Sequence, residues 1–242
     1  MNNVNRNGNF TSSEIGKLMK LDRKGEGFGA PALTYIEEKR MERDFDLSLN
    51  GDASGRPAVW GQFVEKRVFD LLGIRYKECS QETIKHPTIE YWSGSPDGEL
   101  TEDSIQVVCD IKCPFTRKSF HVLATGCVKG SIQFIRDNHD SGDLYYWQIV
   151  SNAILTGATH GELIVYMPYQ SELAEIREAT QNYLGDQNKV AWINWASDDE
   201  LPYLKDGGKF KNLNVLRFEI PQADKDLLTE KVIAAGKLLL AE

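Results

Sequence analysis

The chemically informative residues of this chain concentrate at the end of one expected strand. Ile105–Cys109 is a short apolar run rich in β-branched residues, which predicts a buried strand. The strand continues into Asp110 and Lys112, and its two-residue period places both side chains on one face. Asp97 lies at the turn that precedes this strand. A carboxylate and an ammonium group that face a second carboxylate can bind a divalent cation and orient a water molecule.

A further carboxylate, Glu65, lies outside this stretch. The spacing of apolar residues predicts a helix over Ala58–Leu72, and Glu65 falls at the edge of its apolar face. On a helix packed against a sheet, such a position can project toward the strand ends. The competing interpretations are a surface ion pair of Glu65 with Lys66 or Arg67, and a surface ion pair between the strand-end aspartate and lysine.

Together these residues suggest a magnesium site suited to phosphodiester cleavage. Asp97 and Asp110 would be the principal ligands, the Ile111 carbonyl would be a third, and Glu65 would bind the cation directly or through water. The cation would neutralise charge on the phosphate and activate a water molecule. Lys112 would hold or deprotonate that water.

Gln148 is the polar exception in an otherwise apolar segment. A helix is expected over Leu144–Leu155, ended by Gly157, and Gln148 lies within its buried face. A buried amide needs hydrogen-bond partners. We expect Gln148 to orient Lys112 or to contact a phosphate oxygen.

The start of the chain contains a candidate phosphate-binding segment. Thr11 and Glu14 have the spacing of a capping box, which predicts a helix over Ser12–Leu21. The unpaired N–H groups at such a helix start suit a phosphate, and Ser12 and Ser13 add hydroxyl donors. The same pattern is also typical of an ordinary helix cap.

The distribution of charge bears on whether the chain binds nucleic acid. The formal net charge of −8 argues against a protein that coats nucleic acid by charge alone. Basic residues nevertheless cluster in an expected helix over Thr116–Val128, just beyond the acidic strand end, and include Arg117 and Lys118. We therefore expect Arg117 and Lys118 to contact a polyanionic substrate.

Length and composition favour an ordinary globular protein. The 242 residues suit one large domain, and the hydrophobic content of 41% is typical of a soluble chain. No run approaches the ~18 apolar residues of a membrane span, and no signal peptide is evident, so we expect a cytoplasmic protein. The cysteines form no Cys-x-x-Cys pair, which favours buried thiols over a metal site.

The pattern of elements predicts a single α/β domain with a central mixed sheet flanked by helices. Residues 1–10 should be loose, and the domain should span 11–242, with a core of about 11–167 and C-terminal strands and a helix in 168–242. The remaining expected helices are Ala32–Arg43 and Gln222–Leu240, and the remaining strands are Arg75–Cys79, Ile89–Ser93, Glu162–Met167, Trp192–Trp195 and Leu216–Ile220.

Four motifs follow one another along the chain: Trp60-Gly61-x-x-x-Glu65, Ser95-Pro96-Asp97-Gly98, Asp110-Ile111-Lys112-Cys113-Pro114 and Tyr145-x-x-Gln148. Their order and residue types resemble the PD-(D/E)xK nuclease superfamily, and more narrowly the lambda-exonuclease/YqaJ group of viral recombination nucleases. The resemblance covers roughly residues 11–167. Asp110 stands where many relatives carry Glu, and the superfamily pattern admits either.

This resemblance implies a restriction-endonuclease-like core and a Mg²⁺-dependent DNA exonuclease, with Mn²⁺ as a substitute. Such an enzyme would act 5′→3′ on linear duplex ends and leave single strands for phage-type homologous recombination. The resemblance further implies a 5′-phosphate pocket with Ser12, Ser13 and Ser95, a homo-oligomeric ring, a single-strand annealing partner and, for a viral protein, the host cytoplasm. The alternatives are a sequence- or structure-directed endonuclease of the same fold and a non-catalytic DNA-end-binding protein.

Overall fold

Strand β6 (Ile105–Lys112) lies at the centre of a five-stranded sheet. The computed structural model describes residues 6–49, 55–73, 75–79 and 83–241. The sheet order is β2-β5-β6-β7-β8, in which β6 and β7 are parallel and every other pair is antiparallel. The other strands are β2 (Lys77–Glu78), β5 (Gly98–Glu102), β7 (His160–Tyr166) and β8 (Leu213–Glu219). The predicted mixed central sheet and the predicted bounds of β6 are therefore confirmed.

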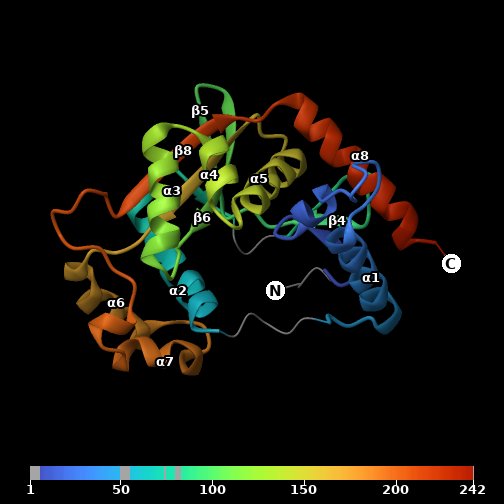
Figure 1. Cartoon of the computed structure of the whole chain (residues 1–242). Coiled ribbons are helices and arrows are strands. Elements are labelled where there is room, and N and C mark those ends of the chain that lie inside the picture. The colour runs from blue at the N-terminus through green and yellow to red at the C-terminus, as the bar shows by residue number, and fades with distance from the viewer. Residues whose placement is uncertain (1–5, 50–54, 74, 80–82, 242) are drawn as a thin grey trace.

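Helices cover both faces of this sheet and enclose two apolar cores. One core packs α3 (Arg117–Lys129), α4 (Ile132–Asn138), α5 (Gly142–Thr156) and α8 (Gln222–Leu239). The other packs α2 (Arg56–Leu72), α6 (Leu173–Ala179) and α7 (Gln187–Trp195). In Figure 1, α6 and α7 lie on one side of the molecule, away from α8 and from α1 (Ala30–Phe45) on the other.

The side chains of β6 alternate between these cores. Val108 belongs to the core of α3, α5 and α8, whereas Cys109 and Ile111 belong to the core of α2 and α7. The two-residue period therefore directs Asp110 and Lys112 to the side of α5. The chain pattern thus decides which helix can reach the charged end of the strand.

The connection from β6 to the parallel strand β7 consists of α3, α4 and α5. Its turns follow ordinary capping chemistry: the hydroxyls of Thr116 and Ser131 accept N–H groups at the starts of α3 and α4. Gly130 and Gly157 take left-handed backbone angles that end α3 and α5, as a glycine does without steric cost. This crossover brings α5 back over the strand from which the chain departed.

A second, smaller sheet joins β1 (Phe10–Thr11), β4 (Trp92–Gly94) and β3 (Ile84–Lys85). Ser12 follows β1 and continues its pairing, because the Ser12 N–H donates to the Ser93 carbonyl at 3.0 Å. Within the described ranges, short 3₁₀ segments span Ile15–Met19, Gln170–Glu172, Thr180–Asn182 and Asp198–Glu200.

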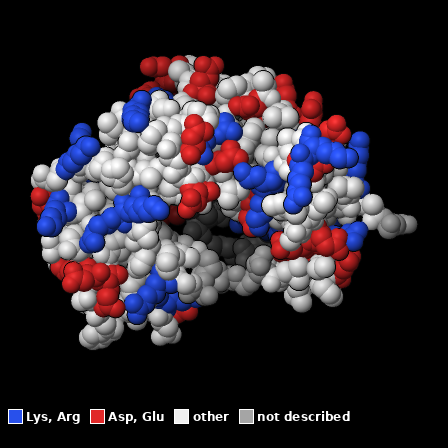
Figure 2. Space-filling model, viewed as in Figure 1, with Lys and Arg blue, Asp and Glu red and all other residues white. Residues whose placement is uncertain are grey.

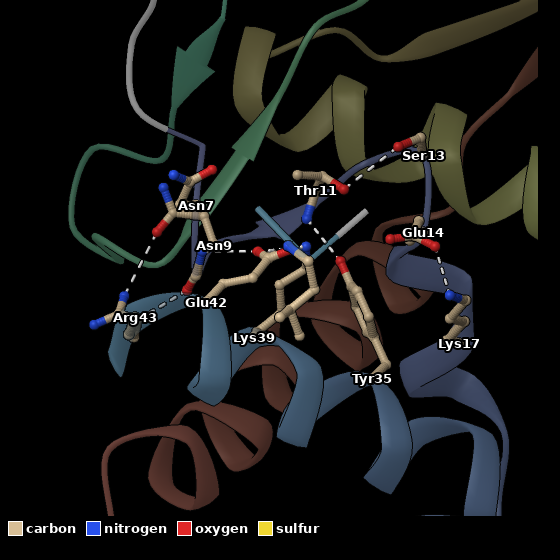
Figure 3. Close-up of polar contacts among 12 residues, drawn as sticks. Asn7, Asn9, Thr11, Ser13, Glu14, Lys17, Tyr35, Lys39, Glu42 and Arg43 are labelled. Atoms are coloured by element: carbon tan, nitrogen blue, oxygen red, sulfur yellow. Dashed lines mark hydrogen bonds and ion pairs between the residues drawn. The ribbon is translucent and has the colours of Figure 1, made fainter. Parts of the chain in front are cut away.

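Helix α1 holds the start of the chain through buried polar contacts, which Figure 3 shows. The Glu42 carboxylate accepts the Gly8 N–H and the Lys39 ammonium group, each at 2.9 Å. The Arg43 guanidinium donates to the Gly8 carbonyl at 2.8 Å. Lys39 and Glu42 are only 6% and 2% exposed. Residues 8–10, within the segment expected to be loose, are buried or half-buried and attached to α1, while residues 1–5 lie outside the described ranges.

The capping box predicted at Thr11 and Glu14 is wrong. Thr11 lies in β1, where its extended backbone pairs with Ser93, and its carbonyl rather than its side chain contacts the Glu14 N–H. The Glu14 side chain pairs with Lys17 instead. The expected helix over Ser12–Leu21 is accordingly reduced to the 3₁₀ segment Ile15–Met19.

The strand predicted over Trp192–Trp195 is also wrong, because these residues end helix α7. Asp186 caps that helix by accepting the Asn188 N–H, and the buried residues Val190 and Ile193 are three positions apart. Aromatic and β-branched content favoured a strand, but helical packing determined the conformation.

Among helices within the described ranges, none has the length and apolar character required to cross a membrane.

The buried Glu42 contacts predict a large stability difference between two glutamates on α1. Burial opposes ionisation of Glu42, but the Gly8 N–H and Lys39 outweigh it and lower its pKa. Glu42→Gln leaves the Lys39 charge buried without its partner and should lower the free energy of unfolding by ~3 kcal/mol. Glu37→Gln, which removes an exposed pair with Arg40, should cost less than ~0.5 kcal/mol. Urea denaturation of both variants measures this difference, and equal losses would contradict the anchoring role.

Candidate active site

Asp97 is fixed to β6 at the point where the hairpin ladder ends. The last paired residues of β5 and β6 are Gly98 and Cys109. One position further, the Asp97 carboxylate replaces the missing strand and accepts the Ile111 N–H at 2.6 Å. The N–H and C=O groups of a strand residue point to the same edge, so the Ile111 carbonyl also faces the side of Asp97. The predicted approach of Asp97 to Asp110 is therefore present in the fold.

Asp110 and Lys112 form a close ion pair on the side of α5. The Lys112 ammonium nitrogen lies 2.7 Å from one Asp110 carboxylate oxygen, and the Asp110 side chain is only 1% exposed. Gln148, from α5, accepts from Lys112 at 3.3 Å. The Tyr145 ring lies 4.8 Å from the same nitrogen, measured to its centroid. The prediction that Gln148 contacts Lys112 agrees with this geometry.

Glu65 reaches the same place from α2. It lines a cleft of about 650 Å³ together with Ile111 and Lys112 at the end of β6, and with residues from the starts of α2, α3 and α5. Figure 2 shows this face of the molecule hollowed near its centre, with acidic side chains on part of the rim. The three carboxylates thus come from α2, from the turn before β5 and from β6.

The electrostatics indicate that these carboxylates share one environment. Burial raises the pKa of Glu65 to about 7, a shift that Lys112 opposes and Asp110 reinforces. Burial likewise raises the pKa of Asp97, and the charges of Asp110 and Glu65 add to the effect. Burial raises the pKa of Asp110 despite the nearby Lys112. Mutual repulsion of this kind is relieved by a bound cation.

The donor set fits a hard divalent cation. Neither oxygen of the buried Asp110 carboxylate makes a hydrogen bond within the described ranges, since its contact with Lys112 lacks hydrogen-bond geometry. No three acidic, imidazole or thiol side chains of the described residues already surround one point. Mg²⁺ does not require such a cage, because it keeps several waters and is usually held by one or two carboxylates. Asp110, Asp97 and Glu65, with the Ile111 carbonyl, offer oxygen donors of the kind it prefers.

The predicted phosphate-binding residues occupy different places. Ser12 is buried, and its hydroxyl lies 2.8 Å from the Ser151 hydroxyl on α5, whereas Ser13 is exposed. The Ser95 hydroxyl lies 3.2 Å from that of Thr83. Ser12 and Ser95 lie near the turn that leads to Asp97, and none of the three serines lines the cleft of Glu65. Their proposed contact with a terminal phosphate stays a prediction.

Arg117 and Lys118 begin helix α3 and are both exposed. The Arg117 guanidinium donates to the Tyr203 carbonyl at 3.0 Å and lies over the Tyr203 ring. Its contact with a polyanion likewise stays a prediction.

Sequence reasoning missed Ser119 and His139, which line the cleft and contact each other at 2.7 Å. Twenty positions separate them, and no local pattern indicates that they meet.

Family comparison gives an independent result. Among curated protein sequences, none matches this chain. The sequence profile of the YqaJ-like viral recombinase domain matches residues 3–159, which is more than half of the chain. The chain belongs to the YqaJ-like viral recombinase domain family. The YqaJ match contains all four motifs and every carboxylate of the cleft, so the resemblance inferred from the motifs is confirmed.

Solved structures share the fold of this YqaJ-like chain. The alkaline exonuclease LHK-Exo from Laribacter hongkongensis, also crystallised with dAMP, is 18% identical with a TM-score of 0.59, over 97% of this chain and 89% of its own. A phage-related exonuclease from Haemophilus somnus 129PT is 14% identical with a TM-score of 0.65, over 96% and 93% of the two chains. At these identities the likeness establishes the common architecture.

The raised pKa of Glu65 predicts an unusual pH dependence of stability. A carboxyl group with a folded pKa near 7 and an ordinary value of 4.5 stabilises the fold fully below pH 4.5, and that contribution disappears as the pH rises to 7. In the absence of metal, Glu65→Gln should therefore stabilise the protein at pH 8 by ~2 kcal/mol and change little at pH 4.

Thermal unfolding in EDTA at both pH values measures this effect. Glu178→Gln, at an exposed position of α6, serves as the control and should shift the midpoint at neither pH. If Glu65→Gln were neutral or destabilising at pH 8, the carboxylate would not be in the repulsive environment described.

Proposed function

We propose that this chain is a Mg²⁺-dependent deoxyribonuclease that degrades linear duplex DNA from its 5′ ends and leaves single strands for phage-type homologous recombination. The observation that carries the proposal is the convergence of Glu65, Asp97 and Asp110 beside Lys112. The three carboxylates are buried or half-buried and repel one another. The repulsion among these carboxylates opposes folding in the absence of a cation, and carboxylates in such an arrangement are the groups that cation-assisted phosphate hydrolysis needs.

Each group of the site has a defined task in this proposal. Asp97 and Asp110, with the Ile111 carbonyl and Glu65, hold Mg²⁺, which when bound neutralises phosphate charge and lowers the pKa of a water molecule. Lys112 holds the attacking water and places positive charge beside the phosphate. Gln148 accepts a hydrogen bond from Lys112 and so fixes the position of its ammonium group.

The family and the fold support a nuclease acting at DNA ends. The family is one of viral recombinase domains, and the two structural neighbours are named as exonucleases. By the same resemblance, we propose Mn²⁺ as a substitute metal, a ring-shaped homo-oligomer and a single-strand annealing partner. We also propose Ser12, Ser13 and Ser95 as contacts of a 5′-phosphate. The competing proposal is an endonuclease of the same fold, which would cut DNA without ends.

Replacement of Lys112 tests the catalytic assignment. Lys112→Ala should slow Mg²⁺-dependent release of nucleotides from linear duplex by ~10²- to 10⁴-fold, because the group that holds the attacking water is lost. Lys66→Ala removes an exposed lysine that follows Glu65 on α2 but lines a different pocket, and it should change the rate less than about twofold. If the unmodified protein released nucleotides from no substrate, a DNA-end-binding role would replace the enzymatic one.

The DNA substrate tests end dependence and polarity. Linear duplex with a 5′-phosphate should be degraded at least ~10-fold faster than linear duplex without it, because a terminal phosphate adds charge-assisted hydrogen bonds. Strands labelled at the 3′ end should retain their label longer than strands labelled at the 5′ end. Closed circular duplex should stay intact, and cleavage of the circle would favour the endonuclease.

A further inference from the structure

Ser119 and His139 form a hydrogen-bonded pair on the wall of the cleft. Ser119 lies in the first turn of α3, and His139 follows the end of α4. The Ser119 hydroxyl oxygen is 2.7 Å from the Nε2 atom of His139. Both residues line the same cleft as Glu65 and Lys112.

The hydrogen bonds determine which ring nitrogen of His139 carries the proton. Its Nδ1 atom accepts the Ser141 backbone N–H at 3.1 Å and therefore bears no proton. Burial lowers the pKa of His139, although Asp140 opposes the shift, so the ring is neutral at pH 7 and above. A neutral imidazole carries one proton, which must lie on Nε2. His139 is thus the donor to Ser119, and the hydroxyl of Ser119 is the acceptor.

This assignment leaves the hydroxyl proton of Ser119 available. A serine hydroxyl donates one hydrogen bond and accepts two. Among the residues that the structure describes, the Ser119 hydroxyl contacts His139 alone, so no acceptor takes its O–H. The other hydrogen bond of Ser119 is made by its backbone N–H, which donates to the Thr116 hydroxyl. The Thr116 cap holds the backbone of Ser119, and the His139 ring packs against the Tyr145 ring at 5.3 Å between centroids. The pair is an oriented donor facing the cleft.

We propose that Ser119, held by His139, binds a phosphodiester oxygen of a nucleic-acid strand in this cleft, beside the phosphate that is cleaved. The ligand must be an acceptor, because the unused group of Ser119 is an O–H. It should carry negative charge, because Ser119 lies in the first turn of the 13-residue helix α3, whose N-terminus favours an anion. The proposed cation would offset the Glu65 carboxylate, which lines the same cleft as Lys112. A backbone phosphate meets both requirements.

The same geometry excludes a nucleophilic role for Ser119. A serine nucleophile needs a base that accepts its proton, as an unprotonated imidazole nitrogen would. In this pair the nitrogen that faces Ser119 is the protonated one, and the unprotonated Nδ1 is occupied by Ser141. His139 is a positioning residue, and Ser119 is a binding residue.

Binding to chemically modified duplexes tests the proposal, which takes only the identity of its ligand from the proposed function. Single uncharged methylphosphonates are placed in turn at the phosphates near one end of a linear duplex, and affinity is measured by fluorescence anisotropy in the cleavage-blocked Lys112→Ala background. A methylphosphonate at one of these phosphates should weaken binding ~10-fold when Ser119 is present and less than about twofold in Ser119→Ala, and this loss of affinity is the penalty compared below. A structural effect of Ser119→Ala would lower the affinity for every duplex equally and would leave this penalty unchanged.

Two further variants complete the experiment. Ser119→Thr retains the hydroxyl and should restore the full penalty, whereas His139→Phe keeps a ring against Tyr145 but removes the N–H and should reduce the penalty severalfold. The pattern should be the same with and without a 5′-terminal phosphate, and dependence on that phosphate would assign Ser119 to the terminus instead and overturn the proposal. If the methylphosphonate weakens binding equally in Ser119→Ala and in the protein that retains Ser119, the role of Ser119 is overturned and the proposed nuclease is not. Absence of any duplex binding overturns the proposed nuclease as well.

Discussion

The hydrogen bond from the Ile111 N–H to the Asp97 carboxylate is the constraint on which the site depends. Strand β5 stops at Gly98, and an aspartate side chain continues the ladder for one more position. A backbone donor of a central strand is thereby satisfied, and a carboxylate is held against Asp110 without a longer strand. The same Asp97 side chain thus supports the strand and, in the proposed function, binds the cation. The cost is electrostatic, because burial raises the pKa of Asp97 and repulsion from Asp110 raises it further.

The other elements of the fold place further side chains at the end of β6. The parallel pairing of β6 with β7 requires a long crossover, and here three helices form it. The crossover returns α5 over the strand end, which brings Gln148 to Lys112, and it closes one wall of the cleft with Ser119 and His139. Helix α2 supplies Glu65 from the opposite core. Side chains from both helical layers therefore meet at the end of the central strand β6.

Much of the site could be predicted from sequence because its signals are local. The apolar run before Asp110 has the length and β-branched content of a buried strand, and the turn at Pro96 places a second carboxylate, Asp97, at a hairpin. The errors arose where tertiary pairing overrode local preference: Thr11 entered a small sheet with β4 instead of capping a helix. Trp192 likewise belongs to a helix although its neighbours favour a strand. The pairing of Ser119 with His139 depends on the turn between α4 and α5, which no short-range pattern determines.

The position of β7 has a consequence for how this domain can be divided. The family match ends at residue 159, one residue before β7 begins, yet β7 pairs with six consecutive residues of β6. A fragment that stopped there would convert the central strand into an exposed edge, with its unpaired backbone groups open to other chains. Such an edge invites intermolecular association and aggregation. Residues 160–241 therefore cover the strand that carries Asp110 and Lys112, and the stretch matched by the family profile is shorter than the stretch needed to complete the central sheet.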